Sequence, residues 1–186
     1  MIRWLAVILI AAGLLVPVVT NADQKDPRLK GLFERLRASG DPVEAKAAEF
    51  AIWQIWTEAG DPAIDSLMTL GIQAMQSGNI AGAYGLFDAV IKQAPGFAEG
   101  WNKRATVLYM AGQYDASAAD VEKTLALEPR HFGALSGLGL INMARERDDD
   151  AVKAFEAALE VHPHLTGPRA NIEAIRRKTQ QRKRDI

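Results

Sequence analysis

One pattern of small, large and proline residues recurs every 34 residues along this chain of 186 residues, and it restricts the fold more than any other feature. Its four columns are Pro95, Pro129 and Pro163; Gly71, Ala105 and Gly139; Leu67, Trp101 and Leu135; and Phe87, Val121 and Phe155. Proline cannot continue a helix, so the prolines mark boundaries between units. A small residue lets two helices approach, and large residues fill the space beside it. One helix pair cannot bury its apolar face alone, so the sequence predicts a stack of pairs.

The period and the order of the columns resemble the tetratricopeptide repeat, a helix–turn–helix unit of this length. This resemblance implies an all-α, right-handed α-solenoid of stacked repeats with a C-terminal capping helix. We expect repeats at residues 63–95, 98–129 and 132–163, where the resemblance is strongest. We interpret residues 23–62 as a degenerate helical pair that stacks as an atypical end repeat, and residues 164–186 as the capping helix and a basic tail. Together these make about nine helices.

Residues 1–22 predict a secretory signal peptide. Arg3 precedes an apolar run from Trp4 to Val19, and the small residue Ala22 ends the segment. An uncleaved membrane anchor is the alternative, although Pro17 interrupts the run and a span needs about 20 apolar residues. The chain has no cysteine, which excludes disulfides and thiolate metal sites and favours a bacterial periplasm. We therefore expect a periplasmic protein, or one anchored in the inner membrane and facing the periplasm.

The resemblance also implies a binding surface, because the first helix of each tetratricopeptide repeat lines a concave face on which peptides are usually bound. The residues that we expect there, free of packing duties, are Met68, Ile72, Met75, Asn102, Lys103, Thr106, Tyr109, Met110, Leu140 and Met143. Methionine is flexible and polarisable, so such a surface could adapt to an apolar peptide or helix. The alternative is that some of these methionines fill gaps in the core.

Co-chaperones of the same family use Lys, Asn and Arg side chains on these helices to hold a partner's terminal carboxylate. Only Asn102 and Lys103 have suitable chemistry here, whereas Ile72 and Leu140 occupy positions where polar groups are expected. The sequence therefore argues against such a carboxylate clamp. Trp53 and Trp56, in the degenerate pair, either seal the end of the array or form an accessory patch, and we favour sealing.

No catalytic or metal-binding pattern emerges from the sequence. His131, His162 and His164 lie in turns, with no cysteine and no HExxH motif to complete a ligand set. Asp148, Asp149 and Asp150 lack the alternating ligands of a calcium loop and are better explained as caps of a helix N-terminus. We also find no GxSxG motif and no phosphate-binding glycine loop. We expect no enzyme activity, no cofactor and no metal.

Charge is distributed unevenly along the chain. Residues 23–168 carry 14 Lys and Arg against 21 Asp and Glu, whereas residues 169–186 carry seven against two. The basic tail could contact anionic lipids or an acidic partner, but such a run is more often a solvated helix face. Export argues against nucleic acid as a partner. The sequence thus predicts a non-catalytic periplasmic adaptor that binds a peptide or helix of a cell-envelope protein, the alternatives being a membrane-tethered assembly factor, a small-molecule binder or a cryptic enzyme.

Overall fold

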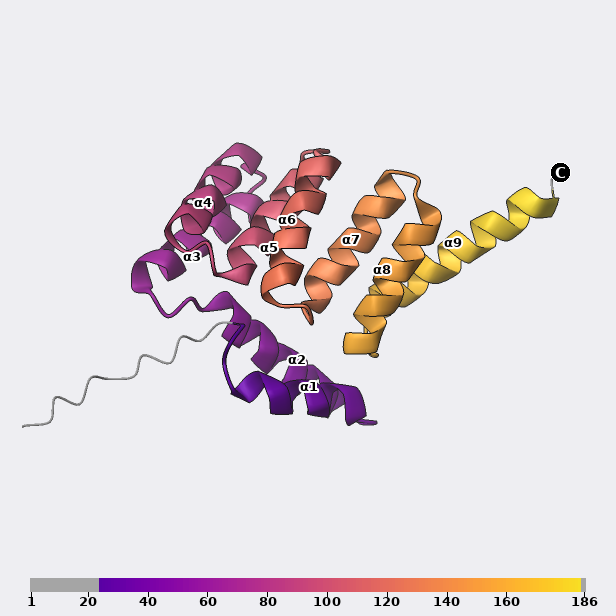
Figure 1. Cartoon of the computed structure of the whole chain (residues 1–186), viewed down its shortest axis with the longest axis horizontal. Helices are drawn as coiled ribbons and strands as arrows, with labels where there is room; N and C mark the ends of the chain where they lie inside the picture. Colours follow the sequence, from indigo (N-terminus) through magenta and orange to yellow (C-terminus); the bar gives the residue numbers. More distant parts are fainter. Residues whose placement is uncertain (1–23, 185–186) are drawn as a thin grey trace, which may run out of the picture.

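The computed structural model describes residues 24–184, which form nine α-helices joined by short turns (Figure 1). The helices are α1 (Arg28–Ala38), α2 (Pro42–Thr57), α3 (Pro62–Gln76), α4 (Ile80–Gln93), α5 (Ala98–Met110), α6 (Tyr114–Leu127), α7 (Phe132–Ala144), α8 (Asp148–Val161) and α9 (Thr166–Arg184). The prediction of an all-α array of stacked helical pairs is confirmed. The proposed signal peptide, residues 1–22, lies outside the described residues.

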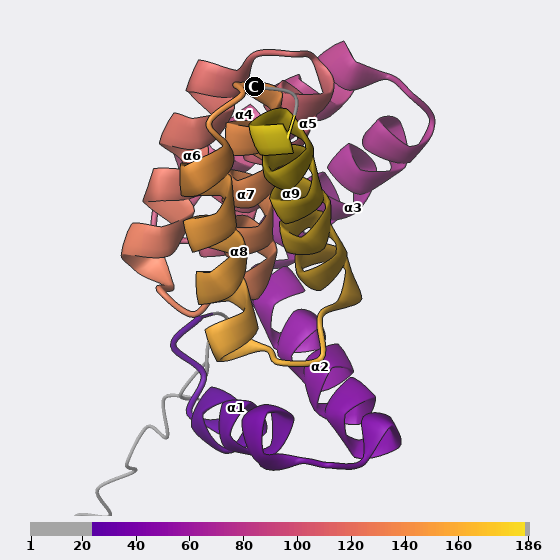
Figure 2. The same cartoon turned by 90° about the vertical axis from the view of Figure 1, so that its right-hand side faces the viewer.

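Helices α3 to α8 form three antiparallel pairs that stack side by side, and α9 follows them. Figure 2 shows two layers of helices, with α3, α7 and α9 in the first and α6 and α8 in the second. Helix α5 is a neighbour of α7 along the first layer. The second helix of each pair ends two residues before its proline, as the helix bounds at Gln93, Leu127 and Val161 show. The prolines therefore do mark the boundaries between units.

The turn inside each pair requires a left-handed residue. Gly78 and Gly112 adopt φ of 77° and 73°, and Glu146, at the same repeat position, adopts φ of 59°. Glycine reaches this region without steric cost, whereas a residue with a Cβ is strained there. The third turn thus keeps the shape of the other two although its sequence lacks the glycine.

The helices of each pair meet at the small residues of the repeat. The contacts pair Gly71 with Phe87, Ala105 with Val121, and Gly139 with Phe155. A Cβ added at Gly71 would lie 2.6 Å from Phe87 Cε1, and one at Gly139 would lie 2.3 Å from Phe155 Cε1. In the middle repeat, Ala105 replaces the glycine and Val121 replaces the phenylalanine, so the two helices share the volume at the contact differently.

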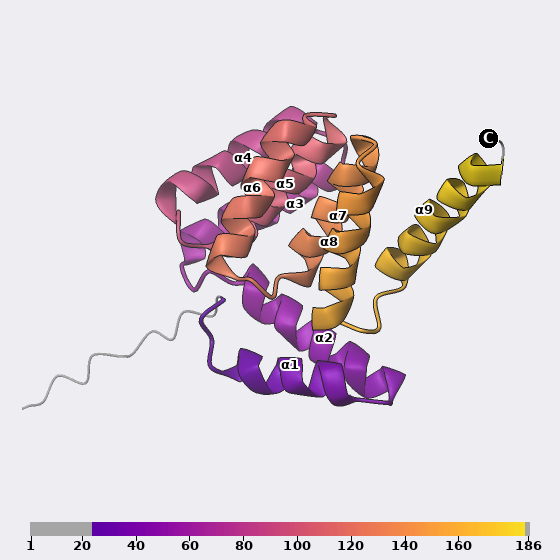
Figure 3. The same ribbon diagram turned by 45° about the vertical axis from the view of Figure 1, so that its right-hand side comes forward.

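The α1–α2 pair does not continue the array as an end repeat. It lies across the edge where the turns between repeats gather, as Figure 1 and Figure 3 show, and it packs beside α5 and α7 instead of covering α3. Its core contains Phe33, Ile52 and Trp56 together with Phe132 from the start of α7. One consequence is that Leu70 on the outer side of α3 is exposed.

The last helix closes the other end of the array. Ile172 and Ile175 of α9 are buried against Ala151 and Phe155 of α8, so α9 caps the array as the resemblance implied. Lys178 Nζ lies 2.9 Å from Asp148 Oδ2, and a second ion pair joins α9 to α8. Part of the basic tail is therefore used to attach α9.

The acidic run at the start of α8 does not cap the helix in the way we expected. Arg147 occupies the N-cap position without a side-chain hydrogen bond, and Asp148, Asp149 and Asp150 fill the first turn. Asp148 instead binds Lys178, and Asp150 binds Arg147. Their position still favours the helix dipole, because negative charge near a helix N-terminus is stabilising.

Candidate functional site

The concave layer of α3, α5 and α7 carries the predicted binding residues, but they divide into buried and accessible groups. Met68 is only 2% exposed and lies in a core cluster with Ile64, Phe87 and Val107. Ile72 and Met75 are half-buried against the same cluster. The prediction that Met68 contacts a partner is therefore wrong: its apolar side chain turns into the interface between the first two repeats.

A groove that both buried and exposed side chains line lies between α5 and α7. Its cavity has a volume of about 200 Å³ and is lined by Asn102, Ala105, Thr106, Tyr109, Ser117, Val121, Gly133, Ser136, Gly137, Leu140 and Ile141. Four predicted residues, Asn102, Thr106, Tyr109 and Leu140, are thus brought together in one place. We call this cavity and its rim the α5–α7 groove.

The rim of the α5–α7 groove is apolar. Leu140 is 37% exposed, and Tyr109 packs beside Tyr114 with ring centroids 5.6 Å apart. Met110 is 52% exposed but is not among the residues that line the cavity. Met143, by contrast, is half-buried against the core of α8 and α9. The described residues of the lining supply hydroxyl and amide groups but no ionisable group except the tyrosine phenol, so they can form hydrogen bonds but provide no acid–base pair.

A buried polar cluster forms the end of the groove nearest α2. Glu99 lies at its centre: its Oε1 is 2.8 Å from Lys103 Nζ, and its Oε2 accepts hydrogen bonds from Asn102 Nδ2 at 2.9 Å and from His131 Nε2 at 2.8 Å. Burial raises the pKa of the Glu99 carboxyl, but the Lys103 charge and the His131 hydrogen bond outweigh it and lower this pKa to about 2. Glu99 is therefore ionised at neutral pH.

His131 connects this cluster to the start of α7. Its Nδ1 accepts a hydrogen bond from the backbone N–H of Ala134 at 3.0 Å, so that the side chain caps α7. The ring hydrogen consequently lies on Nε2, which donates to Glu99. The sequence did not predict this role for His131, although one signal was present: Glu99 and His131 lie about one repeat period apart, so they occupy neighbouring repeats and can meet.

Two tryptophans of α2 complete the cluster. Trp56 is buried and stacks on the His131 ring with centroids 4.2 Å apart, and Trp53 lies beside it, with Lys103 Nζ 5.5 Å from its ring centroid. A Cβ at Gly133 would lie 2.7 Å from Trp53 Cη2, so α7 needs a glycine there to admit the indole. The tryptophans therefore fix the α1–α2 pair to the side of the array and do not seal its end.

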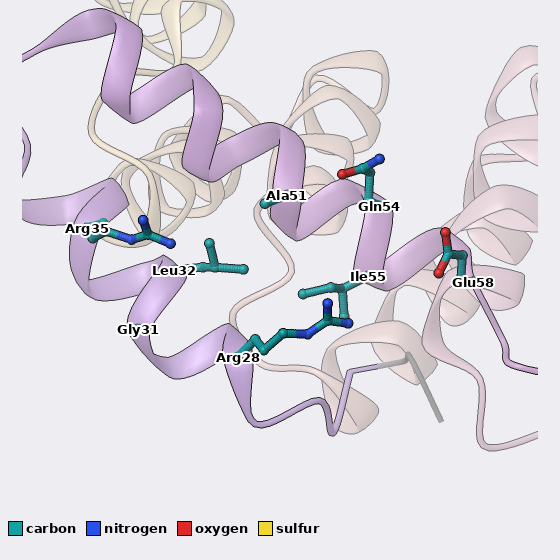
Figure 4. A pocket seen from close by; sticks show the side chains of 8 residues that line it. All are labelled: Arg28, Gly31, Leu32, Arg35, Ala51, Gln54, Ile55 and Glu58. Carbon is teal, nitrogen blue, oxygen red and sulfur yellow. The ribbon is translucent and has the colours of Figure 1, made fainter. Parts of the chain in front are cut away.

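A second hollow lies between α1 and α2, and sequence reasoning did not anticipate it (Figure 4). It has a volume of about 690 Å³ and is lined by Arg28, Gly31, Leu32, Arg35, Ala51, Gln54, Ile55 and Glu58. Arg28 Nη2 lies 2.7 Å from Asp26 Oδ2, and Leu32 and Ile55 belong to the core of the pair. Arg28, Leu32 and Ile55 therefore already have partners within the chain.

Comparison with known proteins agrees with the geometry. The tetratricopeptide repeat family model matches residues 68–121 and 102–165, which together span more than half of the chain. The chain belongs to the tetratricopeptide repeat family. A TPR repeat-containing protein of Rhizobium etli is 36% identical over 136 residues, which are 73% of this chain and 67% of that protein.

Solved tetratricopeptide structures share the fold. The Sgt2 TPR domain of Aspergillus fumigatus superposes with a TM-score of 0.63, at 25% identity, over 67% of this chain and 83% of that one. The first TPR of Spaghetti (RPAP3), bound to the HSP90 peptide SRMEEVD, has a TM-score of 0.61 at 18% identity over 63% and 93%. The TPR2B domain of yeast Sti1, in a complex with pHsp70, has a TM-score of 0.57 at 20% identity over 63% and 97%.

Three further findings apply to the described residues, and they concern His162, metal binding and membrane-spanning helices. His162 is buried against Phe132, and desolvation lowers the pKa of its ring, although Glu49 acts in the opposite direction. Within residues 24–184 no group of three or more His, Cys, Asp or Glu side chains is placed to hold a metal ion. Within the same residues no helix is both long and apolar enough to cross a membrane.

Proposed function

We propose that this tetratricopeptide repeat protein is a non-catalytic adaptor that holds a short segment of a partner protein in the α5–α7 groove. The observation that carries the proposal is the groove itself, with an uncharged lining that includes the exposed apolar side chain of Leu140. A rigid helical array with exposed apolar side chains in a concave groove suits an apolar peptide or helix. Support also comes from proteins of the same fold whose structures contain bound peptides.

The groove favours a polypeptide over a small molecule. Pockets for drug-sized ligands usually enclose about 300–1,000 Å³, whereas this cavity is about 200 Å³ and continues into exposed side chains on its rim. Its ionisable neighbours, Glu99 and Lys103, are paired with each other and leave no free base for catalysis. A cryptic enzyme at this site has no structural support.

We further propose that the partner is a cell-envelope protein and that the adaptor works in the periplasm. The support is the leader-like sequence of residues 1–22, and a membrane-tethered assembly factor is the alternative. The intact mass of the protein isolated from its own cells decides between them. A mature chain that begins at Asp23 supports export and cleavage, and a chain that retains residues 1–22 supports the tether.

The groove is tested by a matched pair of variants. Thr106→Arg places a long charged side chain in the lining, and Ala119→Arg places the same side chain on the exposed surface of α6. A photoreactive phenylalanine at each position, irradiated in cells, should cross-link a specific partner segment from position 106 and not from position 119. Copurification of that partner should be lost with Thr106→Arg and kept with Ala119→Arg. Equal capture by both arginine variants would place the binding site elsewhere.

A further inference from the structure

Three side chains that could recognise a ligand carboxylate already surround a carboxylate of this chain. Lys103 forms an ion pair with Glu99 at 2.8 Å, and Asn102 and His131 contact it through hydrogen bonds at 2.9 and 2.8 Å. These donors come from two neighbouring repeats and lie beside the α5–α7 groove, which Asn102 also lines. The chain's own glutamate thus occupies the place that an anionic ligand group would need.

Glu99 is firmly held in this place. Its side chain is fully buried, and its two oxygens have three partners, two from α5 and one from the turn before α7. Trp53 covers the same cluster, with Lys103 Nζ 5.5 Å from its ring centroid. An ion pair buried in this way is costly to break, because separating the partners leaves an uncompensated charge away from water. An incoming carboxylate therefore cannot displace Glu99 cheaply.

We propose that Glu99 makes the α5–α7 groove selective for an uncharged, apolar segment within a partner chain and against acidic segments and free carboxyl termini. This inference rests on the proposed function of the groove and adds its ligand class. The charge balance supports it: among the described residues no cation lines the groove, and the adjacent Lys103 is neutralised by Glu99. An acidic ligand group that enters the groove would lose its water and would lie beside Glu99. Since the cation nearest to it, Lys103, is already paired, its binding would be unfavourable.

The apolar surface extends beyond the groove onto α2. Phe50 is 63% exposed and lies one turn before Trp53, so both are on neighbouring parts of the same side of the helix. Val43, two turns earlier, is 76% exposed. These side chains of α2 therefore offer further apolar contact to a segment that passes over Trp53, with Lys46 between Val43 and Phe50 on the same face.

Two displayed peptide libraries test the proposal with the full mature chain. In one library the random segment ends in a free carboxylate, and in the other it is internal, flanked by constant sequence. Each is selected on the wild type and on Thr106→Arg, and only peptides that require an intact groove are counted. We expect such peptides mainly from the internal library, rich in apolar residues and depleted of Asp and Glu. Introducing one acidic residue into a selected peptide should weaken its binding by about tenfold or more.

Glu99→Gln provides the second arm, because the amide keeps the shape of the side chain but removes its charge. The penalty for an acidic residue in the same peptides should then shrink severalfold, since Lys103 is no longer neutralised. Groove-dependent peptides with acidic residues or free carboxyl ends would overturn the inference and leave the proposed function intact. Recovery of no groove-dependent peptide would instead contradict the proposed function. If Glu99→Gln does not fold, the wild-type selections and the acidic substitutions still decide.

Discussion

The contact between Gly139 and Phe155 gives the sharpest test of how the repeats pack. A Cβ at position 139 would lie 2.3, 2.5 and 2.6 Å from three atoms of the Phe155 ring, and that ring is fully buried. Non-bonded carbon atoms approach to about 3.5–4.0 Å at their optimum. Gly139→Ala therefore cannot be accommodated unless Phe155 or the whole of α8 moves away from α7.

The magnitude follows from two opposing effects. Overpacking a well-filled core costs about 1–3 kcal/mol, whereas replacing glycine by alanine inside a helix contributes about 0.5–1 kcal/mol of stability. We expect Gly139→Ala to lower the free energy of unfolding by about 1–2 kcal/mol net. Gly137→Ala, two residues earlier in α7, is the matched control, because a Cβ there meets nothing within 4 Å. It should raise the free energy of unfolding by about 0.5–1 kcal/mol.

A double-mutant cycle assigns the cost to the ring. Phe155→Val in the Gly139→Ala background recreates the Ala105 and Val121 pair of the middle repeat. The double variant should be more stable than the sum of the two single changes predicts, with a coupling of about 1 kcal/mol or more. Urea unfolding followed by circular dichroism measures all four proteins. Additive effects, or equal stability of Gly139→Ala and Gly137→Ala, would refute this account of the contact.

Further predictions concern the core, one turn, the groove and the response to acid. Ala105→Leu should cost about 1–3 kcal/mol or more by overpacking, measured by thermal melting. Glu146→Gly should raise the urea midpoint, because it relieves about 1–3 kcal/mol of left-handed strain against a glycine entropy cost of about 0.5–1 kcal/mol. Met68→Ala should lower the free energy of unfolding by about 2–5 kcal/mol, whereas Tyr109→Ala on the groove should change peptide binding more than stability. Burial lowers the pKa of His162 below its usual 6.5, so the unfolded chain binds a proton at this histidine at a higher pH than the folded chain does. The free energy of unfolding should therefore fall as the pH drops below 6.5. In urea titrations, His162→Phe should make this acid-induced fall smaller.

The repeat core could be predicted from the sequence because its contacts recur. Gly71 and Gly139 face phenylalanines 16 residues later, and the 34-residue spacing shows each contact more than once. The third turn follows the same period, because Glu146 lies 34 residues after Gly112 and adopts the same left-handed conformation. A single repeat column could not show how the volume of a contact is divided between its two side chains, because this depends on two columns together.

The binding surface was predicted only in part, because a helix position does not determine burial. Met68, Asn102 and Ser136 share one repeat position. Met68 is apolar and sinks between the first two repeats, Asn102 is buried but bonds to Glu99, and Ser136 lines the groove. Position in the repeat thus places a side chain near the concave face, and its own chemistry and neighbours decide whether it reaches solvent.

The α1–α2 pair shows where the sequence was insufficient, since its location depends on contacts that do not repeat. Residues on several sides of α2 are apolar: Trp56 is buried on His131, whereas Val43 and Phe50 are exposed, so no single face indicated where it docks. Docking rests on long-range contacts such as Arg130 over the Phe33 ring, 4.4 Å from its centroid. His131 caps α7, binds Glu99 and stacks on Trp56, so one side chain ties this docking to the polar cluster that we propose selects the groove's ligand.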